Sequence, residues 1–298
     1  MSAQRRPFIQ DTIALVYDFD GTLSPQPMQE YTVLPEIGVA PAAFWDEVNR
    51  QARANGEEAM LTYMRLIVEQ ANEKRVHIGR EELKRLGRNV KYFPGVKDWF
   101  EASNRFVAEH GGGRIKLRHY IISAGLKEIL EGVSIKRHFS NIFASEYHYD
   151  HHKVATFPKL LITDTTKTQF LFRINKGKEG LGESINTHMP ATLRPIPFEN
   201  MIYIGDGETD VPSMTVTRQQ GGSAIAVYKT GRGSHERQTQ ATCKTLLEAG
   251  RVNFIAPADY ASDSVLAHRV QLLLRSVMAR IEYQRELHNC RREHGIGE

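Results

Sequence analysis

Two aspartates separated by one residue give the strongest chemical signal in the chain. Asp18 and Asp20 follow the apolar run 13–17 and come just before Gly21. Positions i and i+2 of an extended segment point to the same side, so both carboxylates would face one pocket, with Phe19 turned away. Like charges this close repel each other unless a cation or a shared proton intervenes. A hard divalent cation would relieve the repulsion, and Mg²⁺ is the usual ion beside a phosphate. The alternative interpretation is an Asp-rich turn that caps a helix.

Two further strand ends carry polar side chains. Ser123 follows the apolar run 119–122, and Asp206 and Asp210 follow the run 201–204. In open α/β sheets, ligands bind in the crevice beyond the carboxyl ends of the strands. We therefore expect the three strand ends to form one site, in which Asp206 supplies a further oxygen ligand for the cation.

The elements that must position these side chains predict an α/β fold. Short continuous apolar runs are typical of buried parallel strands. Helical patterns lie between them, for example at 126–130 and 212–217. Strands that alternate with helices favour a doubly wound parallel sheet. The predicted strands comprise residues 13–17, 119–122, 201–204, 224–227 and 252–255.

A helical region separates the first two strand ends. Residues 25–92 show apolar side chains at helical spacing, among them Met60 and Met64, which we assign to a core rather than to a ligand. A Pro-Gly turn signal at 94–95 closes the region. We therefore predict a core domain of residues 1–24 and 93–298 with a helical insert at 25–92.

Three other segments have simpler interpretations. Residues 177–199 are rich in glycine and proline and predict a long irregular loop, whereas 266–281 predict one long amphipathic helix. The segment 146–152 contains three histidines, and their spacing fits no standard zinc site, so we expect a polar loop there.

Composition excludes several classes of protein. The chain has 298 residues, of which 41% are hydrophobic, as in ordinary globular proteins. A net charge of +4 gives little support for nucleic-acid binding. Two cysteines form neither a disulfide framework nor a structural zinc site. No apolar run is long enough to span a membrane and no secretory signal is apparent, so we expect a cytoplasmic protein with no nucleic-acid or membrane partner.

These motifs resemble those of the haloacid dehalogenase (HAD) superfamily. The segment 18–22 (Asp-Phe-Asp-Gly-Thr) is similar to its first motif, Ser123 to its second, and 205–210 (Gly-Asp-Gly-Glu-Thr-Asp) to its fourth. The resemblance covers nearly the whole chain and implies a Rossmann-like HAD core. A helical cap inserted between the first two motifs is typical of the phosphoserine-phosphatase-like branch, so the resemblance implies that 25–92 is a cap over the active site.

The third motif of the family is a lysine or arginine, and two lysines compete for it. Lys167 begins a run that predicts a helix start, as the motif lysine does in this branch. Lys176 lies at the far end of that helix, about 13 Å away at 1.5 Å per residue, so both cannot serve. We favour Lys167 and leave Lys176 as the alternative, because the loop 177–199 makes the separation from Asp206 longer than the family pattern suggests.

The resemblance also implies the roles of the carboxylates. Asp18 would be the nucleophile that forms an aspartyl-phosphate, and Asp20 the general acid and base. Mg²⁺ would be held by the Asp18 carboxylate, the Asp20 backbone carbonyl and Asp206. Dehalogenases of the superfamily lack the second aspartate, so Asp20 favours phosphate chemistry.

The remaining motif residues would hold the phosphate. Ser123 and Lys167 would bind the phosphoryl oxygens, and Asp210 would orient Lys167 or a metal-bound water. The prediction is a Mg²⁺-dependent HAD-type phosphatase, a phosphomonoester hydrolase acting on a small soluble phosphorylated metabolite. A phosphotransferase or phosphomutase, or a catalytically silent binding protein on the same scaffold, are the alternatives. The substrate, the cap residues that select it and the oligomeric state stay open.

Overall fold

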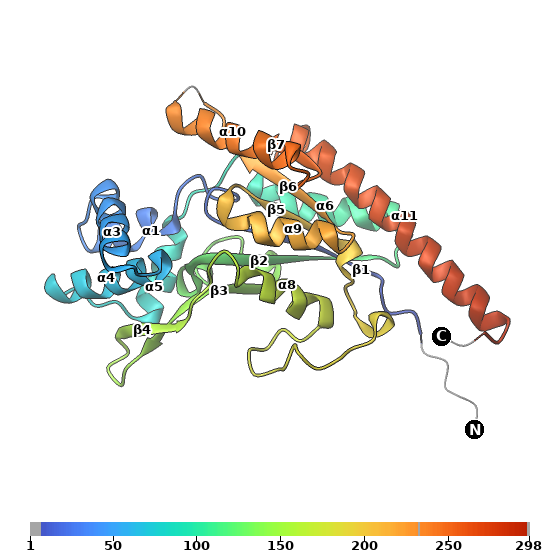
Figure 1. The fold of residues 1–298 in the computed structure, drawn as a ribbon, viewed down its shortest axis with the longest axis horizontal. Helices are drawn as coiled ribbons and strands as arrows, with labels where there is room; N and C mark the ends of the chain where they lie inside the picture. Colours follow the sequence, from blue (N-terminus) through green and yellow to red (C-terminus); the bar gives the residue numbers. More distant parts are fainter. Residues whose placement is uncertain (1–6, 232, 297–298) are drawn as a thin grey trace.

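A seven-stranded sheet forms the centre of the computed structural model, which describes residues 7–231 and 233–296 (Figure 1). The strand order is β4-β3-β2-β1-β5-β6-β7, and every pair is parallel except β3 with β4. The predicted doubly wound α/β fold is therefore confirmed. The strands are β1 (Thr12–Tyr17), β2 (Lys116–Leu126), β3 (Phe139–Tyr149), β4 (Ala155–Leu160), β5 (Met201–Gly205), β6 (Ser223–Tyr228) and β7 (Phe254–Pro257).

Strand β1 lies in the middle of the sheet and is buried along its whole length. Alternate residues of the strand point to opposite faces, so Ile13, Leu15 and Tyr17 pack into one hydrophobic core, whereas Ala14 and Val16 pack into the other. A strand buried on both faces has a continuous apolar sequence rather than an alternating one, which explains why the run 13–17 was recognisable.

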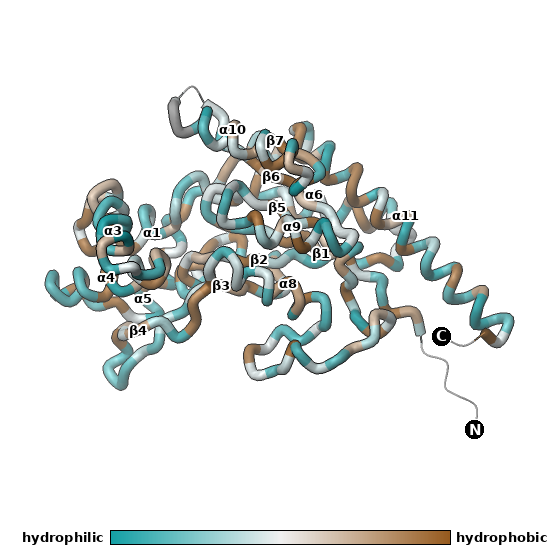
Figure 2. Tube along the Cα trace, viewed as in Figure 1, coloured by the Kyte–Doolittle hydropathy of each residue, from teal (hydrophilic) through white to brown (hydrophobic). Residues whose placement is uncertain are grey.

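Helices cover both faces of the sheet. One core contains residues of α6 (Val96–His110) and α11 (Val265–Glu293), and the other contains residues of α8 (Lys167–Lys176), α9 (Val211–Gln219) and α10 (Ser234–Glu248). The long C-terminal helix α11 buries its first half against the sheet and continues beyond it (Figure 1). Hydrophilic and hydrophobic residues alternate along it, as expected for the predicted amphipathic helix (Figure 2).

The predicted insert is helical. Its elements lie between β1 and α6 and form one end of the molecule, away from the far end of α11 (Figure 1). Met64 and its helical neighbours pack into the core that also holds α6, as the spacing predicted. The division of the chain into core and cap domains stays a prediction. The elements are α1 (Met28–Tyr31), α2 (Val33–Glu36), α3 (Pro41–Asn55), α4 (Ala59–Glu73), α5 (Arg80–Leu86) and the 3₁₀ turn η1 (Gly87–Asn89).

A hairpin of β3 and β4 contacts this helical insert and was not predicted from the sequence. Tyr147 donates a hydrogen bond from its hydroxyl to the Met64 carbonyl at 2.8 Å, and the Ala155 N–H donates to the Ile78 carbonyl at 2.9 Å. The expectation of a polar loop at 146–152 was wrong for its first half, because β3 continues to Tyr149. The polar composition of 146–149 conceals the end of β3, although Glu146 and Tyr147 are buried there. The edge strand of the hairpin is β4, whose side chains are mostly exposed or half-buried.

The remaining segments are short. Helix α7 (Lys127–Leu130) follows β2 directly, so Leu126, which we expected in a helix, ends the strand instead. The excursion 177–199 is irregular, as predicted, apart from short 3₁₀ turns. The 3₁₀ turns of the chain are η2 (Lys136–His138), η3 (Ala191–Leu193), η4 (Phe198–Asn200) and η5 (Glu208–Asp210).

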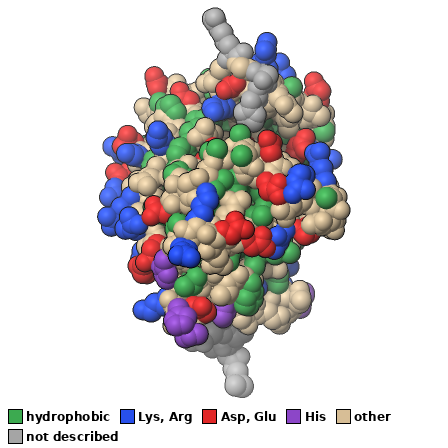
Figure 3. All heavy atoms as spheres, turned by 90° about the vertical axis from the view of Figure 1, so that its left-hand side faces the viewer, with side chains coloured by type: hydrophobic (Ala, Val, Ile, Leu, Met, Phe, Trp, Pro, Cys, Tyr) green, Lys and Arg blue, Asp and Glu red, His purple; other side chains and the backbone are tan. Residues whose placement is uncertain are grey.

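The surface at the insert end carries interspersed acidic and basic side chains (Figure 3). This face therefore shows no extended basic patch of the kind that binds nucleic acid. Among the described residues, no helix is both long and apolar enough to cross a membrane.

Candidate active site

The nucleophile candidate Asp18 sits at the carboxyl end of β1, between two neighbouring strands. Tyr17 is in register with Ile121 of β2 and Ile204 of β5, and the Asp18 N–H donates to the Ile204 carbonyl at 2.9 Å. The backbone of Asp18 is therefore fixed by the sheet itself. Only 4% of the residue is exposed.

The loop after Asp18 turns sharply and carries Asp20. Gly21 has φ +80°, and a Cβ at this position would collide with the carboxylate of Asp206, so only glycine fits. Phe19 is fully buried in the core, turned away from the site as predicted. The Asp20 carboxylate accepts a hydrogen bond from the N–H of Met28, the first residue of α1, at 2.8 Å. The first helix of the insert therefore begins next to the side chain of Asp20.

Ser123 lies near the end of β2, on the strand beside β1. It is buried, and its Oγ accepts a hydrogen bond from the Gly125 N–H at 3.0 Å. A Cβ on Gly125 would lie 3.2 Å from Oδ2 of Asp20 and would collide with Met28. Ser123, Asp20 and the start of the insert therefore meet within a few ångströms of one another.

Lys167 opens helix α8 and reaches into the same site. Its Nζ donates to Oδ1 of Asp18 at 2.9 Å and to Oδ1 of Asp210 at 2.8 Å, and only 1% of the residue is exposed. The alternative, Lys176, donates instead to the carbonyls of Ile185 and Thr187 in the excursion 177–199. The structure therefore brings Lys167, and not Lys176, to Asp18.

Asp206 and Asp210 complete the acidic group. Asp18, Asp206 and Asp210 each place a carboxylate oxygen within 4.8 Å of the other two. Oxygen donors at this spacing suit a hard cation such as Mg²⁺. The fully buried Asp210 also accepts hydrogen bonds, from Lys167 on Oδ1 and from the Asp206 N–H on Oδ2 at 3.1 Å. It therefore lies in the acidic group and is also hydrogen-bonded to the lysine.

Burial and crowding raise the proton affinity of the site. Burial, partly offset by the charge of Lys167, raises the pKa of Asp18 to about 6. Burial and the charge of Asp18 hold the pKa of Asp20 and of Asp206 well above the usual range. Burial lowers the pKa of Lys167, but Asp18 and Asp210 more than compensate, so its pKa is raised and the ammonium persists. A cation bound among these carboxyl groups would relieve their mutual repulsion and favour their ionised forms.

Tyr203 contacts the site and was not identified from the sequence. It lies in β5, is fully buried and donates a hydrogen bond from its hydroxyl to Oδ1 of Asp210 at 2.7 Å. The available signal was a tyrosine within an aliphatic strand, because a buried phenol needs a hydrogen-bond partner.

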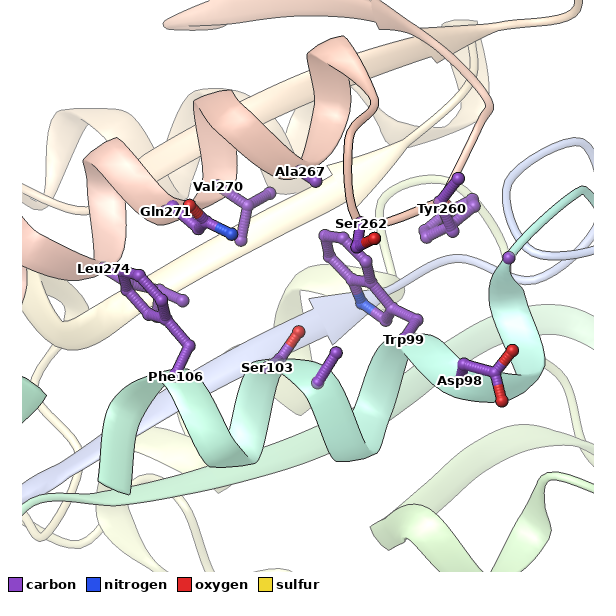
Figure 4. Close-up of a pocket in the computed structure, with 13 residues that line it drawn as sticks. Asp98, Trp99, Ser103, Phe106, Tyr260, Ser262, Ala267, Val270, Gln271 and Leu274 are labelled. Atoms are coloured by element: carbon purple, nitrogen blue, oxygen red, sulfur yellow. The ribbon is translucent and has the colours of Figure 1, made fainter. Parts of the chain in front are cut away.

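A separate cavity of about 260 Å³ lies between α6, α11 and the loop 260–262 (Figure 4). Two of its wall residues also form hydrogen bonds within or next to the loop 18–22, which we call the catalytic loop. The Tyr260 hydroxyl donates to the Thr22 carbonyl at 2.9 Å, and Trp99 Nε1 donates to the Tyr17 hydroxyl at 2.8 Å. The cavity contains none of the predicted site residues, so we treat its wall as structural support.

A family model named haloacid dehalogenase-like hydrolase matches residues 15–215. The chain belongs to this family. The matched segment contains every predicted site residue, from Asp18 to Asp210. A protein of Borreliella burgdorferi, described only as uncharacterized, is 26% identical over 287 residues, covering 86% of this chain and 94% of the relative.

Solved structures agree on the fold. A HAD family hydrolase from Salmonella enterica serovar Typhi has a TM-score of 0.56 at 14% identity, over 90% of this chain and 72% of that one. A phosphoserine phosphatase with a phospho-aspartyl intermediate analogue has a TM-score of 0.53 at 14% identity, over 88% and 99%. A probable phosphoserine phosphatase from Vibrio cholerae has a TM-score of 0.54 at 13% identity, over 94% and 69%.

These comparisons confirm that the chain is a member of the HAD superfamily with the fold of its phosphoserine-phosphatase-like branch. The prediction of a HAD-type phosphatase agrees with both the family model and the fold.

Proposed function

We propose that this HAD enzyme is a Mg²⁺-dependent phosphomonoester hydrolase that works through an aspartyl-phosphate on Asp18. The observation that carries the proposal is the pairing of Asp18 with the buried ammonium of Lys167, two residues before a second carboxylate, Asp20. A nucleophile, a charge that holds a phosphate and an acid are thereby gathered at one strand end.

In the first step, a carboxylate oxygen of Asp18 attacks phosphorus and the ester P–O bond breaks. With a pKa of about 6, Asp18 is mostly ionised at neutral pH and therefore nucleophilic. The raised pKa of Asp20 keeps a proton on its carboxyl group, which this residue gives to the departing alkoxide. Lys167 and Ser123 hold the phosphoryl oxygens while negative charge passes from the attacking oxygen of Asp18 to the departing oxygen of the ester.

In the second step, water attacks the phosphorus of the aspartyl-phosphate. Asp20, now a carboxylate, takes the proton from that water, and the Asp18–phosphate bond breaks to regenerate the free carboxylate. Phosphate leaves, and both aspartates return to their initial states. One residue thus serves as acid and then as base, and its partly exposed position allows the attacking water to reach it.

The oxygen atoms of Asp18 and Asp206 would hold Mg²⁺, with the Asp20 carbonyl as a third protein ligand. The ion would supply positive charge that lowers the repulsion between an anionic nucleophile and an anionic phosphate. Asp210 is engaged with Lys167 and Tyr203, so we assign it to orienting the lysine rather than to primary coordination.

The substrate we propose is a small soluble phosphorylated metabolite. The first helix of the insert begins next to the Asp20 carboxyl group, so the leaving group that Asp20 protonates would lie against the insert. Residues 25–92 then act as the cap that selects it. A cytoplasmic location stays a prediction from the sequence.

The test is hydrolysis of p-nitrophenyl phosphate with and without Mg²⁺, by the native enzyme and by Asp18→Asn. We expect Mg²⁺-dependent turnover that falls by roughly 10³-fold or more in the variant, since the carboxylate nucleophile is lost. Asp98→Asn, at an exposed position of α6 that is none of the predicted site residues, is the control and should keep native turnover. Full activity in Asp18→Asn would overturn the mechanism.

The alternatives give different outcomes with a radiolabelled phosphate donor. A hydrolase releases the label as inorganic phosphate, whereas a phosphotransferase or phosphomutase passes it to an added alcohol or sugar. A silent binding protein forms no hydroxylamine-sensitive label on Asp18 with any donor.

A further inference from the structure

Tyr203 and Tyr120 occupy equivalent places on the two strands that flank β1. Each is in register with Val16, Tyr120 from β2 and Tyr203 from β5. Both are fully buried in the same core, beneath α8 and α9. The two phenols therefore share strand position, burial and face, and differ in what their hydroxyl groups contact.

The hydroxyl groups have different partners. The Tyr120 hydroxyl donates to Oε1 of Glu179, which lies in the excursion after α8, at 3.0 Å. The Tyr203 hydroxyl donates to Oδ1 of Asp210 at 2.7 Å, the oxygen that also accepts from Lys167. Only Tyr203 is connected to the catalytic carboxylates.

Oδ1 of Asp210 has two donors, the phenol of Tyr203 and the ammonium of Lys167. Oδ2 accepts from the Asp206 N–H, so three donors fix the plane of this carboxylate. Asp210 is fully buried, so water cannot replace a donor that is lost. The Lys167 ammonium also donates to Oδ1 of Asp18 at 2.9 Å. Hydrogen bonds therefore connect Tyr203, through Asp210 and Lys167, to the nucleophile.

We propose that Tyr203 is a positioning residue that acts through Asp210 to hold the Lys167 ammonium at Asp18. The ring is anchored in the strand by core packing, so its hydroxyl is a rigid donor rather than a mobile one. Removing the hydroxyl leaves Asp210 with two donors. The carboxylate can then rotate more freely, so it holds the Lys167 ammonium less tightly. The inference rests on the proposed function, in which Lys167 holds the phosphoryl oxygens.

The kinetic test compares Tyr203→Phe with Tyr120→Phe, which deletes the matched hydroxyl outside the site. We expect kcat to fall roughly 10- to 100-fold in Tyr203→Phe, as for the loss of a hydrogen bond to a charged group, with a smaller change in KM. Tyr120→Phe should stay within about twofold of native kcat, although it loses stability as well. Equal losses of kcat in both variants would show a purely structural effect and overturn the proposal.

A double-mutant cycle with Asp210→Ala, which removes both carboxylate oxygens, tests whether Tyr203 works through Asp210. In that background we expect the further change Tyr203→Phe to lower kcat by less than about twofold, because the connection is already broken. Additive losses would mean that Tyr203 acts by another route, and the proposal would be wrong.

Nitrogen NMR of the Lys167 ammonium separates this proposal from the phosphatase activity. The buried ammonium should give a protected signal in the native protein, absent in Lys167→Met. We expect its hydrogen exchange to be roughly tenfold faster in Tyr203→Phe and unchanged in Tyr120→Phe. If no phosphate donor is hydrolysed but this difference is seen, the proposed function fails and the positioning stands; an unchanged signal in Tyr203→Phe overturns the positioning.

Discussion

The two faces of the sheet beneath the catalytic loop carry two hydrogen-bonded networks of opposite character. On the face of α8, Tyr203, Asp210, Lys167 and Asp18 form a network with formal charges. On the face of α6, Trp99 donates to Tyr17 and the network continues through neutral groups only. Both networks are buried, and both include a residue adjacent to or within the catalytic loop.

The neutral network continues from Trp99 through Tyr17 to His119 and Asn104. The Tyr17 hydroxyl accepts from Trp99 Nε1 and forms a hydrogen bond of 3.0 Å with Nδ1 of His119. The other ring nitrogen, Nε2, lies 3.3 Å from Oδ1 of Asn104. Burial lowers the pKa of His119 to about 3, so the ring stays neutral.

The two networks show where this fold tolerates buried charge. Charged groups in a nonpolar interior have a high desolvation cost and are retained where they serve chemistry, whereas neutral networks satisfy buried polar groups without that cost. We therefore expect the α8-side network to control activity and the α6-side network to control stability. The following predictions test that division.

The largest effect is expected for Lys167→Met, which removes the only positive charge from the charged network. Activity should fall by roughly 10³-fold or more, since one lost phosphate-binding donor alone costs about 10² to 10³. The buried carboxylates left unpaired should also destabilise the fold by about 3–5 kcal/mol. Turnover and urea unfolding measure the two effects.

Lys176→Met is the matched control, because this lysine lies on the same helix but binds the excursion 177–199. It should keep native kcat. If Lys167→Met retains activity within tenfold of native, the charged network is not the catalytic one.

A smaller effect, on stability alone, is expected for His119 as pH falls. Its pKa is about 3 in the fold and near 6.5 when unfolded, so the unfolded chain binds the proton more readily between these values. The stability contributed by His119 is complete above pH 6.5 and is lost toward pH 3, with a slope of up to about 1.4 kcal/mol per pH unit.

The measurement is the free energy of unfolding against pH for the native protein and for His119→Asn, in which the amide oxygen can accept from Tyr17. The native curve should fall more steeply below pH 6.5 than the curve of the variant. Parallel curves would mean that the imidazole is protonated without cost, which contradicts a neutral network.

The smallest effect is expected for Trp99→Phe, which removes the first donor of the neutral network. We expect a loss of about 1–3 kcal/mol in stability, from the donor and from reduced packing, and less than about threefold in kcat. Thermal unfolding and steady-state kinetics of the same sample would measure both. If kcat falls as far in Trp99→Phe as in Tyr203→Phe, the α6-side network also controls activity and the proposed division between the two faces is wrong.

The sequence located much of this arrangement because strand ends are easy to recognise. The apolar run 13–17 predicted β1, and the aspartates that follow it had to lie at the sheet edge. The same reasoning placed Ser123 and Asp206, whose strands are direct neighbours of β1. Parallel register converts a linear order of motifs into a cluster in space.

Long-range contacts were beyond reach of the sequence. The resemblance to the family's helix-opening lysine favoured Lys167 over Lys176, and the structure brings Lys167 to Asp18, but no local pattern contains its contact with Asp210. Tyr203 stands out in an aliphatic strand as a phenol that needs a hydrogen-bond partner, but nothing local identifies Asp210 as that partner. The hairpin of β3 and β4 pairs through its backbone, with polar residues on an exposed face, and so lacked an apolar run.

The bond between the Met28 N–H and the Asp20 carboxylate has a consequence for how such enzymes diversify. The donor belongs to the main chain, so every residue type except proline can supply it at this position. Mutations can therefore rewrite the side chains at the start of the insert while the Asp20 carboxylate keeps its anchor. On the proposed function, in which the insert selects the substrate and Asp20 is the acid, substrate preference can drift here without each change having to rebuild the proton-transfer group.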